Sequence, residues 1–142
     1  MEFELVTSEG LVVHETVYEV LLPTRQGQIG VLSGHTELVS LTAEGIITIR
    51  KSASDDTSEY VHIAVAGDGV IEVHNNYVRV LADEAVHSDD IDEQKAHEAY
   101  EAALRMVKEA KDSVSIHHAR MSLDRSSVRL KLADLRHHRK RR

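Results

Sequence analysis

Ten histidines and no cysteine limit the metal and catalytic chemistry open to this chain. Without cysteine there is no disulfide and no thiolate zinc site. His117 and His118 are adjacent, so on a helix they would point to different faces, and no HExxH pair occurs. Serine, histidine and aspartate are present without the GxSxG turn that exposes a nucleophile. We therefore expect neither a metal site nor an enzyme active site.

The densest glycine cluster lies between Pro23, the single proline, and His35. Gly27, Gly30 and Gly34 stand there among apolar residues. Glycine permits tight turns and close strand packing, whereas the GK[ST] ending of a phosphate-binding loop is missing. Spacing alone predicts a hairpin corner in a β-domain.

A length of 142 residues predicts one domain, or one domain with an appendage. No apolar run approaches the ~20 residues of a membrane helix, and the first ten residues do not resemble a signal peptide. The absence of cysteine fits a reducing compartment. We therefore expect the chain to reach a membrane only through a partner.

Charge is unevenly distributed along the chain. The stretch 129–142 holds seven Lys and Arg residues and one acidic residue, Asp134, a net of +6 that leaves −13 for the rest. A basic end on an acidic body indicates an acidic partner, a nucleic acid or an anionic ligand. A solvated chain end is the alternative, and is the interpretation we favour for the terminal HHRKRR.

Residues 1–86 are predicted to be strands. Short runs rich in Val, Ile, Thr and Tyr, such as YVHIAVA and YVRVLA, alternate with turn signals. Gly67–Gly69 is one predicted turn, and Asn75–Asn76 is another because asparagine tolerates positive φ. Many short strands without intervening helices predict an antiparallel sandwich or barrel.

Residues 87–142 contain no glycine or proline and are predicted to be helical. Asp89 or Asp90 is expected to cap the first helix, with Asp92 and Glu93 in its first turn. A second start is expected at 112–113. The chain is therefore predicted to be of the α+β class, an antiparallel β-sandwich followed by a two-helix antiparallel hairpin.

The apolar seams of the two helices differ in strength. The first is mostly alanine, which buries little area and predicts a weakly held hairpin. The second helix has two seams, so one is free to meet the sandwich or a partner. A mobile arm and a stable hairpin packed on the sandwich both remain open. The first-helix seam is Ala96, Tyr100, Ala103, Val107 and Ala110; those of the second are Ile116, Ala119, Leu123, Ser126 and Leu130, and Val114, Met121, Val128, Leu132 and Leu135.

The run LPTRQGQIGVLSGHTELVSLTAEGIITIR, starting at Leu22, resembles the glycine-rich signature of the ε subunit of bacterial F-type ATP synthases. The resemblance extends over essentially the whole chain and implies a sandwich of about ten strands, with domains at 1–86 and 87–142. The matching residues are Gly27, Ile29, Gly30, Val31, Leu32, Gly34, His35, Leu38, Gly45, Ile46 and Ile49.

The resemblance also implies a role and partners. It implies a non-catalytic rotor subunit that couples proton flow to ATP synthesis, with the sandwich on the γ subunit and the c-ring. It implies that the hairpin reaches the α and β subunits and inhibits ATP hydrolysis, and that the complex lies on the cytoplasmic face of the bacterial membrane. The implied partner contact is Gly30, Val31, Leu32, Gly34, His35 and Leu38.

No cofactor is required by this resemblance, but ATP is implied as a regulatory ligand. The segment DIDEQKAHEA resembles the motif at the start of the first C-terminal helix that contributes to ATP binding in some members. Val86 and Ala102 stand where nucleotide-binding members carry Glu and Arg, and a lysine replaces the motif's arginine, so we expect weak or absent binding. The implied site is Ile91, Asp92, Lys95, Ala96, Arg125 and Arg129; a solvated helix face is the alternative for the two arginines.

A free-standing β-sandwich whose basic hairpin binds nucleic acid is the alternative from another functional class. The acidic body and the lack of aromatic residues on strand faces for base stacking disfavour it.

Overall fold

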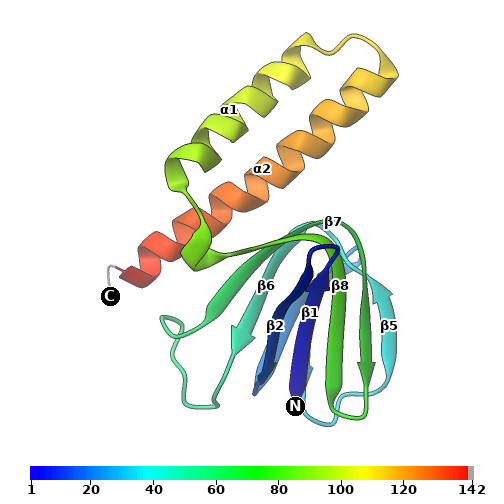
Figure 1. The fold of residues 1–142 in the computed structure, drawn as a ribbon, viewed down its shortest axis with the longest axis vertical. Coiled ribbons are helices and arrows are strands. Elements are labelled where there is room, and N and C mark those ends of the chain that lie inside the picture. Colours follow the sequence, from blue (N-terminus) through cyan, green and yellow to red (C-terminus); the bar gives the residue numbers. More distant parts are fainter. Residues whose placement is uncertain (141–142) are drawn as a thin grey trace.

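The computed structural model describes residues 1–140, with side chains described through residue 138. Eight strands precede two long helices, which confirms the predicted fold class (Figure 1). The strands are β1 (Glu2–Thr7), β2 (Gly10–Thr16), β3 (Glu19–Thr24), β4 (Gly27–Leu32), β5 (Leu38–Leu41), β6 (Gly45–Arg50), β7 (Val61–His74) and β8 (Tyr77–His87).

The two layers of the sandwich share the long strands β7 and β8. The first half of β7 pairs with β6, and its second half pairs with β5. One layer is β4, β3 and β6 with the adjoining halves of β7 and β8; the other is β5, the remaining halves, β1 and β2. Counting each half separately gives the expected ten strand segments.

The predicted turn at Gly67–Gly69 is wrong, because β7 continues through it. The β7–β8 register shifts between Ala66 and Gly69, so this point is a bulge that bends the strand from one layer into the other. The Asn75–Asn76 turn is confirmed, with φ of 47° and 59°. The predicted glycine-rich corner is also confirmed, as the β3–β4 hairpin.

Apolar side chains, all aliphatic except Phe3, fill the space between the layers. Alternating positions of each strand point inward, as Phe3 and Leu5 do on β1 and Val78 and Val80 on β8, all fully buried. The remaining members of this core are of the same kind, namely Val17, Val20, Leu22, Val31, Ile47, Ile49, Ile63, Val65, Ile71, Val73 and Ala82.

The helical part begins with a short 3-10 helix, η1 (Ser88–Asp90), followed by α1 (Glu93–Glu109) and α2 (Ser113–Lys140). Asp92 caps α1, its side chain accepting from the Lys95 amide at 3.0 Å. The expected cap at Asp89 or Asp90 is therefore wrong, because those residues form η1. The second start is confirmed, and Asp112 accepts from the Ser115 amide at 2.8 Å.

The hairpin lies folded against the sandwich through the second half of α2 (Figure 1). Leu132 is fully buried beside Ala64 of β7 and Ala96 of α1. The first half of α2 projects beyond the sandwich, and its Val114 is 64% exposed. The free seam of α2 is thus covered by the sandwich at one end only. Arg141 and Arg142 of the basic end lie outside the described residues.

Candidate functional site

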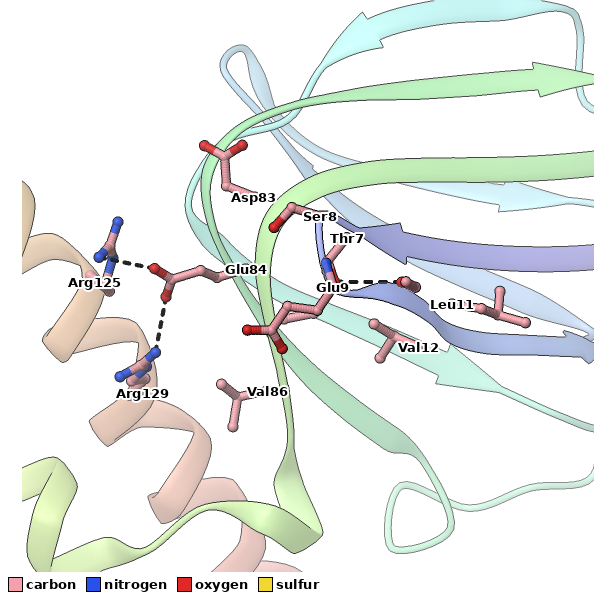
Figure 2. Close-up of a pocket in the computed structure, with 12 residues that line it drawn as sticks. Thr7, Ser8, Glu9, Leu11, Val12, Asp83, Glu84, Val86, Arg125 and Arg129 are labelled. Atoms are coloured by element: carbon pink, nitrogen blue, oxygen red, sulfur yellow. Dashed lines mark hydrogen bonds and ion pairs between the residues drawn. The ribbon is translucent and has the colours of Figure 1, made fainter.

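Two arginines of α2 form ion pairs with one carboxylate of the sandwich. Arg125 Nη1 lies 3.0 Å from Glu84 Oε1, and Arg129 Nη2 lies 3.0 Å from Glu84 Oε2. Each oxygen therefore has its own guanidinium, and Figure 2 shows both arginines directed at the glutamate. Charge-assisted pairs of this geometry are stronger than neutral hydrogen bonds.

Helix and strand periodicity place these three side chains together. Positions 125 and 129 are one turn apart and share a helix face. Glu84 and Val86 are two apart on β8 and share the face that meets α2, where Val86 and Val128 pack against the same buried cluster. The strand thus presents a carboxylate next to the apolar contact.

Glu84, Arg125 and Arg129 together form what we call the clamp. An open groove of about 830 Å³ lies beside it. The β1–β2 turn, the bent part of β8 and α2 form its walls, as Figure 2 shows. Acidic and apolar side chains line it together with the arginines. Besides Gly10 and the three clamp residues, the lining is Thr7, Ser8, Glu9, Leu11, Val12, Asp83, Ala85 and Val86.

Glu44 lies on the other side of Arg125, in a second groove. Burial raises the pKa of the Glu44 carboxyl, and the charges of Asp124 and Glu84 raise it further. Among the described residues its Oε2 is buried without a hydrogen-bond partner. The surroundings of Arg125 are therefore strongly acidic.

The residues of the implied ATP site fall into two groups. Ile91 and Ala96 are buried in the contact between the hairpin and the sandwich. Asp92 caps α1, and Lys95 Nζ lies 3.8 Å from its carboxylate. Arg136, rather than either clamp arginine, donates to the Ile91 carbonyl at 2.7 Å. Arg125 and Arg129 form the second group, at Glu84.

The implied partner contact is partly internal. Val31 is fully buried, and Leu38 packs against the core. Gly34, with φ of +84°, donates its amide to Asn76 Oδ1 at 2.7 Å, and the His35 ring lies 2.7 Å from the Thr36 carbonyl oxygen. Leu32 is exposed, so its side chain is accessible to a partner. This contact stays a prediction.

The sequence reasoning missed an apolar row on the outer face of the layer containing β5. Leu41, Val70, Leu81, Val6 and Leu11 are consecutive cross-strand partners on five strands. Three of them are well exposed: Leu41 (50%), Leu81 (41%) and Leu11 (62%). The signal in the sequence is an apolar residue at an outward position of each strand, but the row exists only once the pairing is known.

The described part of the chain has neither a metal-binding cluster nor a membrane-spanning helix. Within residues 1–140, no group of three or more His, Asp or Glu side chains could hold a metal ion. Neither described helix has a stretch long and apolar enough to cross a membrane.

Comparison with known proteins assigns residues 1–134 to one family. Residues 1–88 match the family model "ATP synthase, Delta/Epsilon chain, beta-sandwich domain", and residues 89–134 match "ATP synthase, Delta/Epsilon chain, long alpha-helix domain". An ATP synthase epsilon chain from Neisseria meningitidis serogroup C is 35% identical over 141 residues, covering 99% of this chain and 98% of that one. One from Endomicrobium trichonymphae is 38% identical, covering 92% and 90%.

Solved structures share the fold. A chain of the Euglena gracilis mitochondrial ATP synthase superposes with a TM-score of 0.75 at 22% identity, covering 88% of this chain and 76% of that one. A chain of the Tetrahymena thermophila mitochondrial ATP synthase, in a structure of its central stalk and c-ring, gives 0.62 at 12% identity, covering 92% and 94%. The nucleic-acid alternative has no support here. The chain belongs to the ATP synthase delta/epsilon family, as an epsilon-type chain of two-part architecture.

Proposed function

We propose that the chain is a non-catalytic central-stalk subunit of an F-type ATP synthase, which helps couple proton translocation to ATP synthesis. Its sandwich docks on the γ subunit and the c-ring, and it is held at the cytoplasmic face of the bacterial membrane by the complex. Family membership supports this role, as does the central-stalk structure that shares its fold. The observation that carries the docking is the exposed apolar row.

The apolar row has the properties of a protein interface. Contiguous exposed apolar side chains on a soluble domain mark contact sites. A polar row runs beside it across four of these strands, with Glu72, Arg79, Glu4 and His14 as successive partners. An apolar strip bordered by charges can exclude water and also orient a partner. We assign the strip to γ, together with the Leu32–His35 corner, which follows β4 and whose Gly34 amide bonds to Asn76 in the β7–β8 turn at one end of the layer that carries the strip.

Replacing Leu81 by Lys tests the docking surface. A charge in the strip should weaken co-purification with γ by tenfold or more, on the order of 1–3 kcal/mol for an interface position. Val114→Lys is the matched control, because Val114 is also exposed but lies on the projecting end of the hairpin. Equal γ binding by both variants, with the sandwich folded, would remove the strip from the interface.

The hairpin is proposed to regulate ATP hydrolysis. The 28 residues of α2 would extend over about 42 Å at ~1.5 Å per residue, enough to reach from the stalk toward the α and β subunits. Truncation after residue 87 should leave γ binding intact and raise hydrolysis by the complex. Unchanged hydrolysis would discard the inhibitory role, whereas lost γ binding would show that the helices are the anchor.

ATP is proposed only as a weak regulatory ligand. Both clamp arginines already hold a carboxylate, and Lys95 pairs with Asp92. Calorimetry with ATP on the isolated chain tests the site. Binding tighter than millimolar would support it, and a millimolar or weaker response would exclude it.

A further inference from the structure

We propose that Glu84, Arg125 and Arg129 form a latch, in which the chain's own carboxylate occupies the arginine pair and fastens the folded hairpin to the sandwich. The latch is a property of the isolated chain and does not depend on the rotor role. Its consequence is that the folded state needs no bound anion.

The geometry shows a fully used carboxylate. Each oxygen of Glu84 meets a different guanidinium, both at 3.0 Å. The three side chains are 37% to 38% exposed, so solvent ions reach them and screen the pairs. An incoming phosphate group would have to displace Glu84 before it could use both arginines.

The position of the latch along α2 determines when its contacts break as the hairpin opens. The apolar contact between α2 and the sandwich is small and runs along α2 from Val128 to Ala133. Arg125 lies about one turn before this contact, and Arg129 lies at its beginning. From there the helix projects away from the sandwich. If the hairpin separates from the sandwich starting at its projecting end, the contact of Glu84 with Arg125 and Arg129 is therefore the first that must break.

The surrounding charges favour the same conclusion. Glu44, Asp83 and Asp124 lie around Arg125, and Glu9 lines the groove beside the clamp. This acidic environment attracts the two arginines and repels free anions. The pair is therefore specialised for a carboxylate on the sandwich rather than for a polyanion from solution.

The test measures hairpin opening in the whole chain. Because the sequence has no cysteine, Glu37→Cys on the sandwich and Lys111→Cys at the hairpin tip provide two unique spin-label sites. Glu84→Gln should increase the open population on the order of fivefold. Raising NaCl from about 0.05 M to about 0.5 M should open the parent protein in the same direction and have little effect on Glu84→Gln.

Glu9→Gln is the matched control, since it removes one charge from the same groove without touching either arginine. It should leave the distance distribution unchanged. Arg125→Gln and Arg129→Gln together should open the hairpin as Glu84→Gln does, and adding Glu84→Gln to that protein should open it no further, because the same contact is already lost.

Two results would overturn the latch. One is equal opening in Glu84→Gln and Glu9→Gln. The other is additional opening when Glu84→Gln is added to the Arg125→Gln, Arg129→Gln protein, because independent effects add and a shared contact does not. If Glu84→Gln does not fold, Arg129→Gln breaks the same pair from the solvent-exposed helix, and unaltered opening in that variant would contradict the proposal equally.

Discussion

Gly69 on β7 lies directly against the backbone of Leu81 on β8. A β carbon at position 69 would be 2.3 Å from the Leu81 carbonyl oxygen and 2.6 Å from Thr42 Oγ1. This contact occurs where the β7–β8 register shifts and the strands pass between layers. The bend that joins the two halves of the sandwich therefore needs a residue without a side chain.

Gly69→Ala should lower the free energy of unfolding of the sandwich by about 2 kcal/mol or more, because the carbonyl cannot move without distorting the ladder. Urea denaturation measures this. Gly30→Ala is the control, since its nearest neighbour is the flexible Leu21 Cδ2 at 3.3 Å. Similar denaturation midpoints for both variants would show that the bend tolerates a side chain.

Leu132→Ala should detach the hairpin while leaving the sandwich intact. Leu132 of α2 is fully buried beside β7 and α1, and its truncation removes about 2–4 kcal/mol of packing. Hydrogen exchange of α2 amides should accelerate, with little change in those of β7. Val114→Ala, at an exposed position, should have no such effect. Faster exchange throughout the sandwich would instead show that the two parts unfold as one unit.

Glu44→Gln should stabilise the folded chain at neutral pH. Burial raises the pKa of Glu44 in the folded state, so between the ordinary and the raised pKa the folded chain holds a proton that the unfolded chain has lost. The parent protein therefore loses stability as pH rises through that window. Thermal unfolding from pH 4 to 8 should show this decline in the parent protein and in the control Glu37→Gln, and less of it in Glu44→Gln.

Glu4→Gln should have the opposite effect on stability from Glu44→Gln. The Tyr77 hydroxyl, 2.6 Å from the carboxylate, and Arg79, at 2.7 Å, lower the pKa of Glu4. The contribution of Glu4 to the stability of the folded chain is present above the ordinary glutamate pKa. It is lost as the pH falls through the lowered pKa of the folded state. The variant should be less stable at pH 7 and lose less stability on acidification. The exposed control Glu109→Gln should follow the parent curve, and a Glu4→Gln curve that also followed it would exclude this contribution.

Much of the architecture could be predicted from local patterns. Alternating apolar residues indicated the strands, and the Asn75–Asn76 pair indicated the β7–β8 turn. The absence of glycine and proline after His87 indicated the helices. The errors were equally local in origin. Gly67–Gly69 has the composition of a turn, but the pairing of β7 with β5 and β6 keeps it within one strand.

The candidate sites could be predicted only in part. The arginines at 125 and 129 were identified from their spacing and the family resemblance, whereas Glu84 was not, because nothing near it in the chain indicates a partner 45 positions away. The apolar row was missed for a related reason. It depends on the register of five strands, and a one-residue slip in any of them would turn its side chain to the other face.

The sequence by itself determined that a β-sandwich precedes a helical hairpin, and the glycine-rich signature pointed to the family, because periodicity, turn chemistry and motif spacing act over a few residues. Only the tertiary structure decided that Glu84 fills the arginine pair, that α2 is covered at one end alone, and that five separate strands form one apolar strip. Those features depend on how distant faces meet, and that is settled by packing and strand register rather than by any local preference.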